Sequence, residues 1–318
     1  WWGWLAPIIP RQMQGTFWGR RDTWTSIAVI AVVLPVTFLL DRVPASVKPV
    51  AVLAALAAAG AAGIMDILLH VAIPEPPVRG ERRAGSLDRV MKPVRDRRFR
   101  PWLVFTAAWS FGMSLGGSLC SLYFLDNLGL DDNLLGGAIA LNVVGLFGSI
   151  LSARRMGRLV DRWGCRRVLL IGHLGWALLP VFWLFATPRT AVLWLSLQSV
   201  VSGVFATAAN NAGLKLVTRF PPPEQSPMYM AVSSSTANIA NGIGALVAGV
   251  FLQVVGSWTA PVGRLTLSAF PVLFVASFVL RLASTLVLVP RVQEKGMRDD
   301  ERPMLLPLFF GLPLKRRR

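Results

Sequence analysis

The sequence predicts an all-α, polytopic membrane helix bundle. Its 318 residues are 54% hydrophobic and only 15% charged, whereas an average soluble domain carries about 25% charged residues. The mean hydropathy is +0.55, and long apolar runs alternate with basic connections. These observations argue against a soluble domain and against a disordered tail, which needs low hydrophobicity. A disulfide framework is excluded because Cys120 and Cys165 are the only cysteines.

Eight apolar runs are long enough to cross a bilayer, whose hydrocarbon core of ~30 Å needs about 20 mostly apolar residues in a helix. The first run is the shortest and contains Pro35, which a membrane helix tolerates when its neighbours satisfy the freed carbonyl. In chain order, the predicted spans cover residues 24–40, 50–73, 101–125, 134–153, 168–187, 190–212, 228–255 and 265–289.

The basic residues between the spans predict an orientation. Alternate connections carry 28 Lys and Arg residues on one side and 4 on the other, and only Arg281 falls inside a span. The richer side is cytoplasmic under the positive-inside rule, so eight crossings place both chain ends in the cytoplasm. This alternation accounts for the net charge of +17 without a nucleic-acid partner, which would need basic residues clustered on one folded surface.

The connection at residues 74–100 divides two spans from six. It is the longest internal connection and mixes Pro, Gly, Arg and acidic residues, as expected of a cytoplasmic linker. The chain also begins at Trp1 without a recognisable signal peptide, which we interpret as a fragment boundary. We therefore expect four regions: residues 1–75 with two spans, 76–100 as the central linker, 101–292 as a six-helix half, and 293–318 as a basic cytoplasmic tail.

The connection between the fourth and fifth spans contains a compact motif. Residues 157–169 read G-R-L-V-D-R-W-G-C-R-R-V-L, so that Asp161 is the only acid among several arginines. Gly157 and Gly164 allow a close backbone approach at a tight connection. A single anion in this setting should be held in ion pairs or at a helix N-terminus, where the helix dipole favours it. The alternative is an ordinary basic loop in which Asp161 pairs with any nearby cation.

This segment resembles the G-x-L-x-D-[RK]-x-G-[RK]-[RK] signature of the major facilitator superfamily, with Cys165 in place of one basic residue. The matching residues are Gly157, Asp161, Arg162, Gly164, Arg166 and Arg167. The resemblance implies that residues 1–292 correspond to helices five to twelve of a twelve-helix transporter, whose second half contains an inverted repeat of three helices.

The resemblance also implies a role for Asp161. In this family the loop acid docks at the cytoplasmic end of a helix in the other half and holds an inner gate closed. Here that helix is the first span, so we expect Asp161 near Arg20 to Thr23, accepting hydrogen bonds from free backbone N–H groups. The expected cationic partners of Asp161 are Arg21, Arg158 or Arg162.

Polar residues on two spans mark a candidate solute pathway. They are Ser110, Ser114 and Ser118 on one face of the third span, and Gln198 and Ser202 on the sixth. The serine hydroxyls either line a water-filled path or bond to their own helix backbone. The resemblance favours the path, because these spans correspond to the seventh and tenth helices, which line the central cavity of the family.

Small residues on other faces predict close helix packing. Gly112 and Gly116 form G-x-x-x-G in the third span. In the seventh span the expected packing row is Ala237, Asn241, Ala245 and Gly249.

Ionisable residues inside the spans are few. Asp66 and His70, four residues apart in the second span, are candidates for proton coupling. They lie near the predicted cytoplasmic end, where side chains reach water, so a plain solvated pair is the alternative. Arg281 is expected to snorkel out of the eighth span. The acids at residues 126–132 lack the spacing that membrane prenyltransferases use for magnesium and diphosphate, so we expect a solvated turn.

The sequence contains no sign of catalysis, a metal or a cofactor. It has no G-x-x-x-x-G-K-[ST] loop, and two His and two Cys make a zinc site implausible. With the resemblance, we predict a secondary transporter in the cytoplasmic (inner) membrane that moves a small solute by alternating access, with or without coupling to a proton or another ion. The alternatives are a membrane-embedded isoprenoid or lipid transferase and a truncated scaffold that does not transport.

Overall fold

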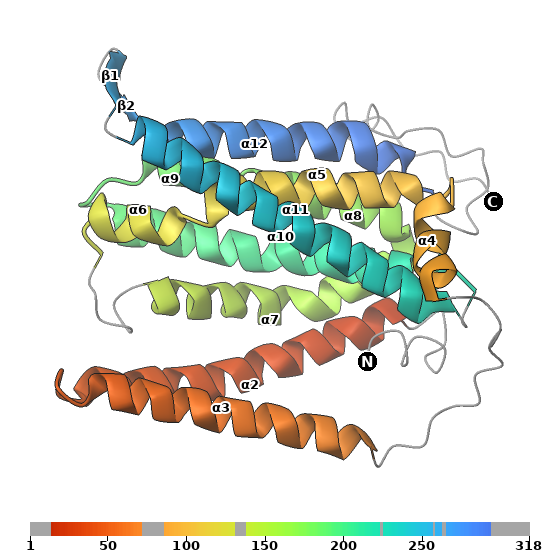
Figure 1. Cartoon of the computed structure of the whole chain (residues 1–318), viewed down its shortest axis with the longest axis horizontal. Helices are drawn as coiled ribbons and strands as arrows, with labels where there is room; N and C mark the ends of the chain where they lie inside the picture. The colour runs from red at the N-terminus through yellow and green to blue at the C-terminus, as the bar shows by residue number, and fades with distance from the viewer. Residues whose placement is uncertain are drawn as a thin grey trace.

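The computed structural model describes residues 14–71, 86–130, 138–222, 225–256, 258–262 and 265–293. In these ranges the chain forms a bundle of long helices with one small hairpin (Figure 1). Seven of the described helical segments are long and apolar enough to cross a membrane. The chain is therefore an all-α, multi-pass membrane protein, as predicted.

The long helices coincide with the predicted spans, but two of them extend well beyond the apolar run from which the span was predicted. α2 (Gln14–Arg42) begins far ahead of residue 24, and α10 (Ala191–Arg219) continues past residue 212. Hydropathy marks only the part of a helix that lies in lipid, whereas polar turns continue the same helix into the interface. The remaining unbroken helices start and end within a few residues of prediction: α3 (Lys48–Val71), α11 (Ser226–Val255) and α12 (Ala269–Leu288).

α7 (Ala138–Trp163) corresponds to the fourth predicted span and explains why seven segments rather than eight meet the length and hydropathy criterion. Three arginines between residues 154 and 158 shorten its apolar stretch. It is nevertheless 26 residues long and packs between α2 and α10. Residues 131–137, with the last two acids of the predicted turn, lie outside the described residues.

Two predicted spans are each built from two helices. α5 (Arg100–Gly117) and α6 (Cys120–Asp126) share the third span, and α8 (Cys165–Ala177) and α9 (Leu179–Phe185) share the fifth. The second break precedes Pro180, which has no N–H to donate and whose ring collides with the preceding turn.

Three short elements complete the described chain. α4 (Ser86–Arg95) lies in the linker, and the 3-10 turn η3 (Val289–Arg291) follows α12. β1 (Thr259–Val262) and β2 (Leu265–Ser268) form an antiparallel hairpin at the end of the bundle opposite α4 (Figure 1). The hairpin corrects the eighth predicted span, because residues 265–268 pair with β1 instead of beginning α12.

The helices after the linker pack as two interlocked groups of three. α5 packs on α11 and α12, and α10 packs on α7 and α8. In chain order, α5 with α6 corresponds to α10, α7 corresponds to α11, and α8 with α9 corresponds to α12. Under this correspondence, the contacts of α5 with α11 and α12 match the contacts of α10 with α7 and α8. This reciprocity is the pattern that the predicted inverted repeat requires.

α2 and α3 form a pair beside this bundle (Figure 1). α2 packs on α7 and touches α10, and it converges on them toward its N-terminal end. α3 packs mainly on α2, and none of its residues is buried. Its apolar surface is therefore free to face lipid or other membrane helices.

Candidate functional site

α2 and α7 meet backbone to backbone at the N-terminal end of α2. Gly15 and Gly19 on α2 face Gly157 and Ala153 on α7, and the residues of each pair are four positions apart. A Cβ added at Gly157 would overlap the carbonyl oxygen of Gly15, and one added at Gly19 would overlap that of Ala153. Small residues at this spacing on facing helices permit such a contact. The first glycine of the motif is thus required for the approach of the two helices.

The carboxylate of Asp161 caps α2 one helical turn beyond that contact. Asp161 Oδ1 accepts a hydrogen bond from the backbone N–H of Gly15 at 3.0 Å. Its Oδ2 accepts from the backbone N–H and the hydroxyl of Thr16, at 2.8 and 2.7 Å. The first N–H groups of a helix have no partner inside it, and the helix dipole favours an anion there. A side chain of α7 therefore satisfies the N-terminus of α2.

Lys215 on α10 supplies the positive charge. Its Nζ donates to Asp161 Oδ1, and the side chains of Lys215 and Asp161 are only 3% and 13% exposed. Burial raises the pKa of Asp161, but the hydrogen bonds from Lys215 and Thr16 and the charge of Lys215 lower it more, so the net pKa lies below its ordinary value. One ionised carboxylate thus joins α2, α7 and α10. We call Gly15, Thr16, Asp161 and Lys215 the Asp161 cluster.

The helix at which Asp161 docks is the expected one, but the contact lies about one to two turns earlier than expected. The expected position was Arg20 to Thr23 because hydropathy placed the start of the span there. α2 begins at Gln14, so its free N–H groups belong to the residues just after Gln14.

The cationic partner of Asp161 in the structure is Lys215, which replaces the expected Arg21, Arg158 or Arg162. Arg158 and Arg162 are exposed, and Arg21 pairs with Asp22 at 3.5 Å. The predicted sixth span ended at residue 212, which left Lys215 in the connection that follows it, but α10 continues to Arg219. The available signal was a single lysine between Leu214 and Leu216 in an apolar run with helical periodicity.

The second glycine of the motif turns the chain. Gly164 has φ 86° and ψ 162°, a backbone conformation that residues with a side chain rarely adopt. This single residue reverses the chain from α7 into α8. Cys165 follows and is fully buried at the start of α8, whereas Arg166 and Arg167 are half-buried there.

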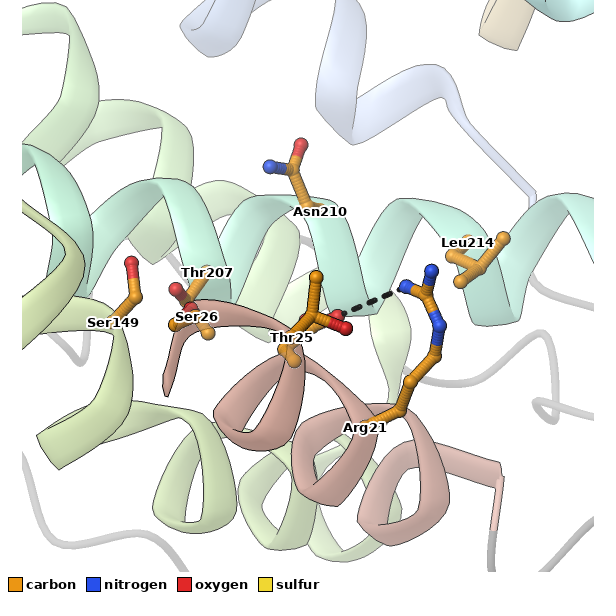
Figure 2. Close-up of a pocket in the computed structure, with 8 residues that line it drawn as sticks. Arg21, Thr25, Ser26, Ser149, Thr207, Asn210 and Leu214 are labelled. Atoms are coloured by element: carbon orange, nitrogen blue, oxygen red, sulfur yellow. Dashed lines mark hydrogen bonds and ion pairs between the residues drawn. The ribbon is translucent and has the colours of Figure 1, made fainter. Parts of the chain in front are cut away.

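A polar cavity of about 400 Å³ lies farther along the same three helices (Figure 2). The lining residues on α2 begin at Arg21, just after the glycine contact, and the last lining residue on α10 is Leu214, directly before Lys215. The Asp161 cluster therefore lies at one end of the cavity. The dashed line in Figure 2 marks the Arg21–Asp22 ion pair in its wall. The lining residues are Arg21, Asp22, Thr25, Ser26, Ser149, Thr207, Asn210 and Leu214.

A second cavity, of about 300 Å³, lies among α5, α8, α10 and α11. We call it the aromatic cavity, because much of its wall consists of the rings of Trp102, Phe105, Trp109, His173 and Trp176. Hydroxyl groups of α5 and α11 also line it. Asn210 and Leu214 line both cavities, so the two are neighbours along α10.

Of the five predicted pathway residues, only Ser110 lines one of these two cavities. Ser114 faces α11, where a Cβ on Gly244 would contact its Cβ at 3.1 Å. Ser118 is exposed, and its hydroxyl donates to the carbonyl oxygen of Ser114. Gln198 and Ser202 are half-buried on α10 and line neither cavity. Their role in a pathway stays a prediction.

The glycine face of α5 packs closely, as predicted, on α12. The hydroxyl of Ser277 donates to the carbonyl oxygen of Gly112 at 2.6 Å, and a Cβ on Gly116 would meet that hydroxyl at 2.8 Å. On α11 the predicted packing row, which begins at Ala237, is wrong by less than one turn. The direction in which α5 crosses α11 decides which small residues are buried, and the sequence does not give that direction. The buried small residues are Ala240, Gly244 and Ala248.

The Asp66–His70 pair lies on α3, and neither residue lines the two cavities. His70 Nδ1 is 3.8 Å from the carboxylate of Asp66 and 2.6 Å from its backbone oxygen. Their side chains are 74% (Asp66) and 36% (His70) exposed. A coupling role for this pair also stays a prediction.

Arg281 corrects the expectation that it snorkels. It is 2% exposed, its Nη2 donates to the carbonyl oxygen of Trp176, and its guanidinium carbon lies 4.8 Å from the ring centroid of Trp109. It points inward because α12 packs on α5 and α8. His173, which sequence reasoning did not single out, is 6% exposed between Phe105 and Trp109. A lone histidine in the middle of an apolar span was the available signal.

The described residues contain no group of three or more His, Cys, Asp or Glu placed to hold a metal ion. The arrangement is instead that of a polar cavity between helices with a buried ion pair at one end.

Comparison with known proteins identifies a family and a fold. The profile of the Major Facilitator Superfamily matches residues 155–316. Among solved structures, the chain resembles a bacterial homologue of the iron transporter ferroportin in an outward-facing state, with a TM-score of 0.57 and 15% identity. This match covers 90% of the chain but only 66% of the other protein, slightly less than two thirds of its length. At this identity the likeness shows the fold alone. A search of curated protein sequences finds no match.

Proposed function

The chain belongs to the major facilitator superfamily, and on that premise we propose that it acts as a secondary transporter that moves a small solute by alternating access. Family membership and the transporter-like fold favour this function over a membrane-embedded transferase. We assign residues 1–75 to the first half of the transporter, 76–100 to the central linker, 101–292 to the second half and 293–318 to a cytoplasmic tail. The distribution of basic residues supports cytoplasmic chain ends and a cytoplasmic (inner) membrane location.

The observation that carries the proposal is the Asp161 cluster. In this assignment α2 belongs to the first half, and α7 and α10 belong to the second. The cluster therefore ties the two halves together at the cytoplasmic end of the polar cavity. Alternating access needs a contact of this kind, which closes one side and is broken when that side opens. We infer that the Asp161 cluster is the inner gate.

The strength of the cluster suits a gate. A hydrogen bond to a charged group contributes about 1.5–3 kcal/mol, and about 1.4 kcal/mol changes an equilibrium tenfold. Loss of the Asp161 charge should therefore shift the balance between closed and open states by a factor of about ten or more.

Access to the polar cavity from the cytoplasm tests the gate. Ser149, in the wall of the cavity, is replaced by cysteine in a background without Cys120 and Cys165, and a membrane-impermeant thiol reagent is applied from the cytoplasmic side. Asp161→Asn should raise the labelling rate about tenfold or more. Arg162→Gln removes a charge from the same end of α7 but outside the cluster, so it should leave the rate unchanged. Equal labelling with and without Asp161→Asn would contradict a gate.

Proton coupling through Asp66 and His70 is a separate proposal, supported by their spacing and by their position on a membrane span. In His70→Ala, uptake by the full-length transporter should no longer respond to an imposed proton gradient, because alanine has no group that can exchange a proton with Asp66. An unchanged response to the gradient in that variant would remove the pair from the mechanism.

A further inference from the structure

The wall of the aromatic cavity is built from flat rings held in place by their neighbours. The ring of Trp109 lies 4.4 Å from that of His173 and 5.6 Å from that of Trp176, measured between centroids. Trp102 Nε1 donates to Ser233 Oγ at 2.8 Å, which fixes α5 against α11. Sites for small organic molecules are typically preformed, mostly apolar and aromatic, with a few polar groups that orient the ligand. The aromatic cavity has this composition.

A positive charge lies directly behind this wall. The guanidinium of Arg281 stacks on Trp109 and donates to the carbonyl oxygen of Trp176, and both tryptophans line the cavity. Its Nε is buried without a hydrogen-bond partner among the described residues. No described Asp or Glu lines the cavity. Arg281 thus does not line the cavity itself but contacts two tryptophans that do, and no described acid in the wall balances its charge.

This arrangement discriminates between ligands by charge. A cation on the cavity side of Trp109 would be repelled by Arg281 through the ring, and it would compete with Arg281 for the electron-rich faces of that ring. An anion in the same place would be attracted. Because the interior is less polar than water, two charges separated by several ångströms still interact appreciably, on the order of tenfold in affinity.

We propose that the aromatic cavity binds a planar aromatic organic molecule that is anionic or neutral, and that it rejects cations, metal ions included. The rings would stack on the planar ligand, and donors such as the Ser110 hydroxyl and the Asn210 amide would bond to its oxygens. This inference rests on the proposed function, because it names the class of solute that the transporter takes. It also separates this chain from a metal carrier, despite the fold that it shares with a homologue of an iron transporter.

The test compares two probes with one ring system and opposite charge, 2-naphthoate and 2-naphthylmethylammonium, by equilibrium dialysis against the full chain in lipid nanodiscs. The naphthoate should bind about tenfold tighter than the ammonium, and Co²⁺ alone should not displace it. Arg281→Met should reduce the preference to less than about threefold. Equal affinities in the wild-type chain, or tighter binding of the ammonium, would overturn the proposal whether or not the Arg281 variant folds.

A matched pair of tryptophan variants locates the probe. Trp176→Ala should weaken naphthoate binding about tenfold, the loss expected for one stacked ring, and it keeps both Trp109 and the backbone carbonyl that holds Arg281. Trp194→Ala removes an indole from α10 outside the cavity and should leave binding unchanged. Equal loss in both variants would place the probe elsewhere and refute the site. Binding at equilibrium does not depend on the gate. If the chain binds naphthoate but Asp161→Asn does not change the labelling rate, the aromatic site stands and the transport proposal fails. If Asp161→Asn raises the labelling rate but naphthoate does not bind, only the proposed class of solute fails.

Discussion

The two charges of the Asp161 cluster should contribute unequally when they are removed one at a time. Asp161→Asn keeps a carbonyl oxygen that accepts from the N-terminus of α2, but it leaves the ammonium of Lys215 unpaired at 3% exposure. Removing one partner of a buried ion pair costs about 3–5 kcal/mol. We take about 3 kcal/mol, because Asp161 is 13% exposed and water screens part of the interaction.

Lys215→Met should have a smaller effect. The carboxylate of Asp161 keeps its three hydrogen bonds from Gly15 and Thr16, so the loss is limited to one charge-assisted bond, about 1.5–3 kcal/mol. The double variant contains no buried unpaired charge. It should therefore be closer to wild type than Asp161→Asn alone, although it carries one substitution more.

The assay is cytoplasmic labelling of a cysteine at Ser149, read as the fraction of time that the gate is open. A loss of about 3 kcal/mol corresponds to a rate about 150-fold higher in Asp161→Asn. Adding Lys215→Met should lower that rate about tenfold, so the double variant loses about 1.4 kcal/mol less than Asp161→Asn alone. Together with the cost of Lys215→Met by itself, this gives a coupling of about 3–4.5 kcal/mol. If the effects of the two substitutions add within about 0.5 kcal/mol, the pair does not act as one unit, and the reasoning fails.

Three further outcomes follow from other contacts. Gly157→Ala should lower the melting temperature of the purified chain, because the new methyl group meets the backbone of Gly15, whereas Gly60→Ala on the open face of α3 should leave it unchanged or raise it. Ser233→Ala should lower the free energy of unfolding in denaturant by about 1–3 kcal/mol, because it leaves the buried indole N–H of Trp102 without a hydrogen-bond acceptor. The pKa of Asp161 lies below its ordinary value, so its contribution is complete above about pH 4 and is lost as the pH falls through the lowered pKa. The difference in thermal stability between wild type and Asp161→Asn should thus be constant from about pH 8 to 5 and shrink only below about pH 4; a difference that already shrinks near pH 6 would contradict this assignment.

The membrane fold was predictable because the bilayer imposes it on the sequence. Each span needs a long apolar run, so composition and spacing are sufficient to locate the membrane helices. The basic residues on alternate connections predict an orientation, which stays a prediction. The ends of α2 and α10 were not predictable in this way. Both helices continue into polar surroundings, where packing on α7 rather than lipid stabilises them.

The candidate site was only half predictable. The glycines and the acid of the motif occupy the expected roles in a close contact, a turn and a helix cap, because each role is local to the chain. Lys215 meets Asp161 across 54 positions, and hydropathy treats a lysine as solvated wherever it occurs. Arg281 was misplaced for the same reason: its inward orientation depends on which face of α12 packs on α5 and α8, and one sequence does not reveal that face.

The central inference, that α2 separates from α7 and α10 at its N-terminal end when the inner gate opens, can be measured as a distance. Spin labels at Arg20 on α2 and Arg158 on α7 occupy exposed positions next to the Asp161 cluster without belonging to it. Pulsed electron–electron double resonance on the reconstituted full-length transporter should show a short distance in the wild type and a second, longer distance whose population grows in Asp161→Asn. A single short distance, identical in wild type, in Asp161→Asn and in the presence of transported solute, would contradict a gate at this position.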